Sequence, residues 1–160
     1  MRACYTVQPS PVGELLVVID GNGALTDLRF DDAGASPPSG AVRDDAALAP
    51  VACQLDEYFT GARRSFDVRL SPSGTPFQRA VWDALRDVPY GETATYGEIA
   101  ARVGRPTASR AVGAANGANP IAIVVPCHRI VGANGTLTGY GGGLDRKRLL
   151  LDLEASRFAC

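Results

Sequence analysis

The sequence predicts an α+β protein of two domains, and three observations support this fold class. Short apolar runs alternate with turn residues in the first part of the chain, whereas the second part carries apolar residues at helical spacing behind N-capping residues. A stretch of Ser, Pro and Gly at 71–74 separates the two parts. With 160 residues, 46% of them hydrophobic, the chain can form one or two small domains. We therefore predict domains over 1–74 and 75–160.

The N-terminal domain is predicted to contain a sheet of β-hairpins. Apolar residues within 5–7, 15–19 and 25–30 indicate strands, because turn-forming Pro, Gly and Asn residues separate these segments. Residues 31–45 hold Ala, Gly, Ser, Pro and acidic side chains with few apolar anchors. We expect this segment to be a surface loop.

A helix and a last strand are expected to complete this domain. Apolar residues recur at helical spacing from Leu48 to Phe59, and Gly61 is placed to end the helix. Phe66, Val68 and Leu70 then alternate with polar residues, which is typical of a strand.

The C-terminal domain is predicted to be helical. Thr75 is an N-cap followed by proline, Thr95 and Glu98 form a capping box, and Thr107 and Gly117 are placed to begin and end a short helix. The three helices are expected over 75–88, 95–104 and 107–116. The last two are short and separated by only a few residues, which predicts a helix-turn-helix.

Basic charge is concentrated in one stretch of the chain. The net charge is −1, but residues 99–149 carry six Arg and one Lys against Asp145 alone, a local balance of +6. A basic surface of this kind can bind phosphates even on a slightly acidic protein, because screening limits each contact to about 10 Å. An ordinary solvated surface is the alternative interpretation.

The second helix of the helix-turn-helix is poor in residues that read bases. Between Ser109 and Asn116, Arg110 is the only long polar side chain, and the rest are mostly Ala and Gly. Small residues permit close approach to a DNA backbone but carry little base information, which favours sequence-independent contact, for example in the minor groove. Packing of one helix on another explains the same composition.

One cysteine lies beside the only histidine. Residues 121–125 are all apolar and are expected to form a buried strand that delivers Cys127 next to His128 and Arg129. A neighbouring cation or base lowers the pKa of a thiol, and the thiolate is the nucleophile. An inert core thiol is the alternative, and it is the interpretation we assign to the three other cysteines: Cys4, Cys53 and Cys160.

Several protein classes are excluded or disfavoured. No apolar run approaches the roughly 18 residues of a membrane span, and the first residues do not resemble a secretory signal. Four scattered cysteines fit a reducing cytoplasm. With a single histidine we expect neither a metal site nor a cofactor.

Several separated blocks resemble, in order and spacing, the signature of the O6-alkylguanine-DNA alkyltransferases, or methylated-DNA–protein-cysteine methyltransferases. The similarity covers about 75–156, with a looser fit before it. The blocks are Arg110–Gly113, Asn119–Pro120, Pro126–Arg129, Gly139–Gly143, Lys147, Leu149–Leu150 and Glu154. The resemblance implies a ribonuclease H-like N-terminal scaffold and a winged-helix-like C-terminal domain. The implied activity is stoichiometric repair of O6-alkylguanine, with O4-alkylthymine as a further candidate substrate.

The resemblance also implies catalytic roles. Cys127 would accept the alkyl group as a thioether, so that each molecule acts once. His128 would take the thiol proton through a water, and Glu154 would orient the imidazole. Asn119 would hold the bend between the second helix and the segment leading to the cysteine.

The implied partner is double-stranded DNA containing alkylated guanine, bound by a monomer with no membrane involvement; cooperativity on DNA stays open. The target base must leave the duplex, and Arg110 would fill the gap while Tyr96 helps rotate the adjacent phosphate. Further DNA contacts are assigned to Thr95, Ala111 and Ala115. The substrate pocket is assigned to Asn116, Val131, Tyr140 and Gly141.

Two other functions fit parts of the sequence. A transcriptional regulator would use the helix-turn-helix for operators and the cysteine as a sensing or structural thiol, but the second helix has few base-reading side chains. A Cys-His hydrolase would turn over repeatedly, although its two partners usually come from distant segments.

Overall fold

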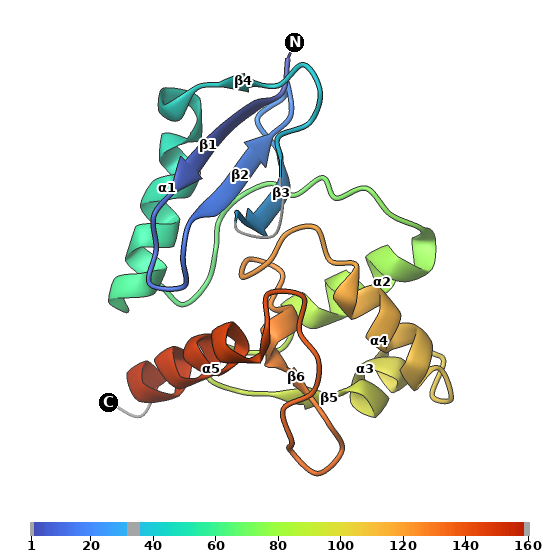
Figure 1. Ribbon diagram of the computed structural model, residues 1–160. Helices are drawn as coiled ribbons and strands as arrows, with labels where there is room; N and C mark the ends of the chain where they lie inside the picture. The colour runs from blue at the N-terminus through green and yellow to red at the C-terminus, as the bar shows by residue number, and fades with distance from the viewer. Residues whose placement is uncertain (1, 32–35, 159–160) are drawn as a thin grey trace. The chain divides into compact units, whose positions relative to one another are not determined.

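The computed structural model describes residues 2–31 and 36–158 (Figure 1). The chain divides into two compact units, Met1–Ser73 and Gly74–Cys160. The first unit combines a sheet with one helix and the second is mainly helical, so the predicted α+β class is confirmed. Among the described residues, no helix is both long and apolar enough to cross a bilayer.

The sheet of the first unit contains the predicted hairpins. Strands β1 (Cys4–Gln8), β2 (Leu15–Ile19) and β3 (Leu25–Phe30) pair antiparallel in chain order. The two-residue strand β4 (Val42–Arg43) pairs parallel with β1 and gives the sheet order β3-β2-β1-β4. The predicted loop over 31–45 is therefore wrong at its end; its residues 32–35 lie outside the described part.

Helix α1 (Asp45–Thr60) contacts β1 and β2 (Figure 1). Its apolar face is buried as the sequence predicts, and Gly61 ends it in the left-handed conformation with φ 85°. Polar residues of β1 also point toward the helix: Thr6 donates to Asp45 at 2.7 Å and Gln8 donates to Asp56 at 2.8 Å. The sheet and helix are thus joined by hydrogen bonds as well as by apolar packing.

The strand predicted at Phe66–Leu70 is wrong. Only an isolated bridge joins Leu70 to Leu25. The reason lies in Gln54 of α1, whose amide donates to the carbonyl of Asp67 at 3.0 Å and accepts from its N–H at 2.9 Å. A side chain therefore satisfies the backbone groups that a neighbouring strand would otherwise pair.

The second unit begins with three helices: α2 (Pro76–Arg86), α3 (Tyr96–Arg102) and α4 (Ser109–Gly117). Both predicted N-terminal caps are confirmed as full capping boxes, Thr75 with Gln78 and Thr95 with Glu98. Helices α3 and α4 pack together as the predicted helix-turn-helix (Figure 1). Strands β5 (Ala94–Thr95) and β6 (Ile130–Val131), the short helix η1 (Cys127–Arg129) and α5 (Leu144–Phe158) complete the unit.

The predicted limits of α4 need correction. Thr107 does not cap this helix, because a turn closed by the Ala108 N–H on the Arg105 carbonyl, at 2.9 Å, contains it. The N-cap is Ala108, which makes no side-chain cap. Gly117 is the last helical residue rather than a stop, and the N–H of Ala118 closes the helix.

Trp82 links α2 to α4, and Gly74 gives it room. The indole N–H donates to the Ala115 carbonyl at 2.8 Å, and the ring is buried. A Cβ at Gly74 would lie 2.5 Å and 2.7 Å from two ring carbons of Trp82, closer than van der Waals contact permits.

We expect Gly74→Ala to lower the free energy of unfolding by about 1–3 kcal/mol, because the buried indole must shift to admit the methyl group. Urea denaturation followed by Trp82 fluorescence, from the only tryptophan in the chain, measures the change. The matched control is Gly117→Ala, where the helix end leaves space around the new Cβ; it should be neutral or stabilising. Equal stability of the two variants would contradict this packing.

Candidate active site

The segment leading to the cysteine is a buried series of turns, so the strand predicted at 121–125 is wrong. The N–H of Val124 donates to the Ala122 carbonyl at 2.8 Å, and that of Val125 to Ile121 at 3.1 Å. Ile123 adopts φ 72°, a left-handed conformation that is costly for a β-branched side chain. The turns therefore need external restraint.

Asn119 supplies that restraint. Its amide nitrogen donates to the carbonyls of Val125, at 2.9 Å, and Ile121, at 3.3 Å, and its oxygen accepts from the Ile121 N–H at 3.0 Å. One side chain thus binds both ends of the turn series. It is also a neighbour of the Cys127 thiol, whose pKa it lowers against the larger effect of burial.

Cys127 begins η1 and is 6% exposed. Burial raises the pKa of its thiol, and hydrogen bonds from Asn119 and Tyr140 offset this only in part. The expected lowering of the thiol pKa by an adjacent cation is therefore wrong for the resting protein. Cys127 is a neutral thiol that needs a base.

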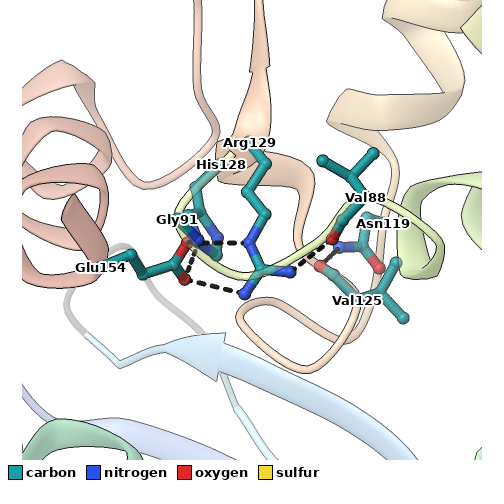
Figure 2. A network of polar contacts seen from close by, with 7 residues as sticks. All are labelled: Val88, Gly91, Asn119, Val125, His128, Arg129 and Glu154. Atoms are coloured by element: carbon teal, nitrogen blue, oxygen red, sulfur yellow. Dashed lines mark hydrogen bonds and ion pairs between the residues drawn. The ribbon is translucent and has the colours of Figure 1, made fainter. Parts of the chain in front are cut away.

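His128, Arg129 and Glu154 form a buried polar network (Figure 2). His128 Nε2 lies 2.7 Å from Glu154 Oε2. Arg129 donates to both oxygens of the same carboxylate, at 2.8 Å and 3.0 Å. The backbone N–H of Gly91 donates to Glu154 Oε1 at 3.4 Å. A carboxylate on α5 thus collects donors from η1 and from the loop between α2 and β5.

The network keeps Glu154 charged and His128 neutral. Burial alone raises the pKa of Glu154, but hydrogen bonds with His128 and Arg129 and the positive charge of Arg129 lower it to about 2. Burial lowers the pKa of His128 and outweighs Glu154, which raises it; the charges of Arg129 and Lys147 lower it further. Because the carboxylate only accepts, Nε2 carries the proton and Nδ1 the lone pair. Within the described residues, Nδ1 has no hydrogen-bond partner.

A cavity of about 230 Å³ is lined by residues of α3, of α4 and of the segment before α5. It is lined by Tyr96, Gly113, Asn116, Gly117, Gly139, Tyr140 and Gly141. Two of these residues are neighbours of Cys127: Asn116 donates to its carbonyl at 3.4 Å, and Cys127 adds to the effect of burial in raising the pKa of Tyr140. Cys127 is therefore a neighbour of residues that line the cavity.

Two family models match the chain. The ribonuclease-like domain of 6-O-methylguanine DNA methyltransferase matches residues 3–72, and its DNA binding domain matches residues 76–156. The chain belongs to the methylated-DNA–protein-cysteine methyltransferase family. The ribonuclease-like scaffold expected for the N-terminal domain is confirmed.

Several members of this methyltransferase family are similar over nearly the whole chain. The enzyme of Methanosarcina acetivorans is 50% identical over 95% of this chain and 98% of its own, and that of Mycolicibacterium paratuberculosis is 53% identical over 94% and 91%. The crystal structure of Mycobacterium tuberculosis O6-methylguanine methyltransferase superposes with a TM-score of 0.90, at 51% identity over 97% of this chain and 94% of that one. Mycobacterium tuberculosis OGT in complex with DNA also gives 0.90, at 50% identity over 96% and 94%.

The structure gathers most of the residues that the methyltransferase signature assigned to catalysis and the pocket. His128 and Glu154 contact each other at 2.7 Å, and Asn119 binds the turns that lead to Cys127. Asn116, Tyr140 and Gly141 line the cavity, whereas Val131 is buried in β6 and is not among the lining residues. Tyr96, assigned to DNA, also lines it, and its hydroxyl lies 2.6 Å from that of Thr138.

The residues assigned to DNA contact fall in different environments. Arg110 and Ala111 are exposed on α4, and Thr95 caps α3. Ala115 is 2% exposed and its carbonyl accepts the indole N–H of Trp82, so its side chain is not on the surface of α4.

The sequence analysis placed Arg129 beside the cysteine but missed its partner Glu154, and it gave Lys147 no contact in the site. Both were counted in the basic stretch, yet both are buried: Arg129 binds Glu154, and Lys147 donates to the Thr138 carbonyl at 3.1 Å. Of the five other arginines in that stretch, four are exposed, and Arg146 is half-buried and donates to the Gly142 carbonyl at 3.3 Å. The available signal was the position of Arg129 directly after ten mostly apolar residues, which indicates that its side chain is buried. A buried cation needs a buried partner of opposite charge.

The remaining cysteines differ from expectation in part. Cys53 is exposed on α1 and is not a core thiol, and Cys4 is half-buried. Cys160 lies outside the described residues. Over 2–31 and 36–158, no group of three or more His, Cys, Asp or Glu side chains could hold a metal ion.

Proposed function

We propose that this protein repairs O6-methylguanine in DNA by transferring the methyl group to Cys127. The single observation that carries the assignment of this cysteine is the neutral, buried His128 beside it, fixed by an ionised Glu154. A buried neutral thiol needs such a base, and neither described cysteine elsewhere in the chain, Cys4 or Cys53, is adjacent to a histidine. Membership of the methyltransferase family supports the same reaction.

The reaction begins with a proton transfer. The thiol proton passes, through a water, to Nδ1 of His128, whose Nε2 proton stays hydrogen bonded to Glu154. The imidazolium that forms is balanced by the carboxylate, as in other nucleophile, base and orienter arrangements.

Alkyl transfer then forms a bond between Cys127 Sγ and the methyl carbon while the bond from that carbon to guanine O6 breaks. The electron pair of the broken bond stays on guanine, and the proton that His128 took from the thiol passes through water to the leaving guanine anion. Burial raises the pKa of Tyr140 well above its usual value, so its phenol is a neutral donor at the pocket for the leaving base. The thioether is not readily reversed, and each chain therefore acts once.

The substrate base must leave the duplex to reach a buried thiol beside residues that line this cavity. Arg110 is exposed on α4 and can enter the gap in the base stack, while Tyr96 lies at the cavity on α3. The mycobacterial relative solved in complex with DNA supports a nucleic-acid substrate. A reducing cytoplasm suits the chemistry, because disulfide formation would consume the acceptor.

We expect Arg110→Ala to slow methyl transfer from duplex DNA by about tenfold or more, since an unfilled stack costs a few kcal/mol of base-flipping energy. Transfer from free O6-benzylguanine, which needs no flipping, should stay near wild type. Single-turnover rates with the two substrates measure the difference. Arg86→Ala, which removes an exposed arginine of α2, is the matched control. Equal slowing with both substrates would reject the stack-filling role.

The function itself is tested by incubation with a duplex that carries one labelled O6-methylguanine. Retention of one label per chain on Cys127 supports the proposal. Repeated turnover would indicate a hydrolase instead, and tight DNA binding without transfer would indicate a regulator.

A further inference from the structure

Arg129 binds Glu154 through a planar fork. Its Nε donates to Oε1 and one terminal nitrogen donates to Oε2, at 2.8 Å and 3.0 Å. This paired geometry is the one in which guanidinium binds carboxylate most strongly, and a lysine cannot reproduce it. The other terminal nitrogen donates to the Val88 carbonyl at 2.7 Å (Figure 2).

The guanidinium has little freedom to leave this position. It is 7% exposed, and its central carbon lies 5.7 Å from the centre of the Tyr90 ring. The Val88 carbonyl and the Tyr90 ring belong to the loop after α2, whereas Glu154 belongs to α5. Arg129 therefore connects η1 to the loop after α2 and to α5. Because the site is buried, water cannot stabilise Glu154 in place of the guanidinium.

The charges that face the imidazole are few. Glu154 and Lys147 face it from α5 and Arg129 from η1, and the neighbouring thiol of Cys127 is neutral at rest. If Arg129 were absent, the negative charge of Glu154 would no longer be balanced by the guanidinium, and its attraction for a proton on the imidazole would be stronger. A buried anion at 2.7 Å from Nε2 favours the imidazolium, which has no lone pair for a thiol proton.

We propose that Arg129 is a positioning residue that keeps His128 neutral, by binding both oxygens of Glu154, so that Nδ1 can accept the thiol proton. The inference rests on the proposed function, in which His128 is the base, and it names the group that sets the protonation of that base. Arg129 touches neither substrate nor thiol proton. When the proton moves from Cys127 to Nδ1, Arg129 stays charged and Glu154 balances the new imidazolium.

The chain offers a direct readout, because His128 is its only histidine. We suggest titrating the unreacted, full-length protein by NMR of the imidazole nitrogens. Wild type, Arg129→Lys and Arg129→Gln are compared, with Arg63→Gln as the matched control. Arg63 also pairs with a carboxylate, Glu57 at 3.1 Å, and with a backbone carbonyl, but in the N-terminal unit.

Wild-type His128 should be neutral at pH 7, with the proton on Nε2. Arg129→Gln should raise its pKa by about one pH unit or more, and Arg129→Lys should raise it less. The rate of methyl transfer to Cys127 should fall off at acidic pH, and in each variant this fall should move to higher pH by the same amount as the pKa of His128. Arg129→Gln should therefore recover part of its lost rate at alkaline pH. The Arg63→Gln titration should match wild type.

Two results would overturn the inference. One is a wild-type His128 that is already an imidazolium at pH 7, a measurement that needs no variant to fold. The other is a folded Arg129→Gln or Arg129→Lys protein that loses rate while the pKa of His128 stays at the wild-type value, which would leave Arg129 a scaffold only. Because the titration uses unreacted protein, failure of the inference is distinct from failure of the proposed function, which would appear as wild-type protein that transfers no methyl group.

Discussion

Cys127→Ser should abolish methyl transfer, lowering its rate by about a thousandfold or more. A serine hydroxyl is a far weaker nucleophile than a thiol, and removing the nucleophile of a coupled group leaves little of its catalysis. The buried environment makes the loss larger, because it disfavours the charged form of any nucleophile at this position. Single-turnover transfer from a labelled duplex measures the effect.

The matched control is Cys53→Ser, which changes an exposed thiol on α1 and should retain full transfer. The Cys127→Ser protein should still bind damaged duplex, because the serine is nearly isosteric and the charged surface is untouched. If transfer survived in Cys127→Ser and disappeared in Cys53→Ser, the acceptor would be Cys53 in the N-terminal unit, and the assignment of Cys127 would be contradicted.

Acid should destabilise the protein in two steps that both originate in the buried network. Burial lowers the pKa of His128, so the unfolded chain binds a proton below about pH 6.5 that the folded chain does not. The pKa of Glu154 falls from 4.5 to about 2, so its stabilisation is complete above about pH 4.5 and is lost as pH falls toward 2. That second step is worth about 3 kcal/mol. Urea denaturation at a series of pH values measures both steps.

Glu154→Gln should remove the lower step and should also cost about 3–5 kcal/mol at neutral pH, because it leaves the Arg129 guanidinium buried without its partner charge. Glu57→Gln, which breaks a partly exposed ion pair with Arg63, is the control and should keep the acid slope of the wild type. An identical slope below pH 4.5 in Glu154→Gln and wild type would show that Glu154 is not held in its charged form.

The sequence predicts elements whose signal is local. The hairpins follow from apolar runs separated by turn residues, and the helices α2 and α3 begin where Thr75 and Thr95 form capping boxes with residues three positions later. Each of these signals lies within about four consecutive residues. The element therefore forms from local interactions, and tertiary contacts add to its stability.

The turns at 121–125 show where such reasoning stops. An apolar run that is buried on every side has no periodicity, so a strand and a series of turns look alike in sequence. What decides between them is the clamp by Asn119 on Ile121 and Val125. Nothing in the composition of the run reveals that a side chain outside it satisfies its backbone.

The site is predicted in part because its members are contiguous, and it is missed where they are not. Cys127 and His128 are adjacent, so their involvement is visible directly. The partner of Arg129 is 25 residues away on α5, and adjacency to the cysteine suggests a cation acting on the thiol instead. The turn of η1 sends the guanidinium toward Glu154, a direction that sequence spacing alone does not give.

The most direct test of the central claim is the mass of the intact protein after incubation with excess duplex carrying O6-methylguanine. We expect every active chain to gain one methyl group in place of one hydrogen, the modified peptide to contain Cys127, and the released DNA to carry guanine at the lesion. A protein of unchanged mass that nevertheless restores guanine, or a methyl group found on another residue, would contradict it.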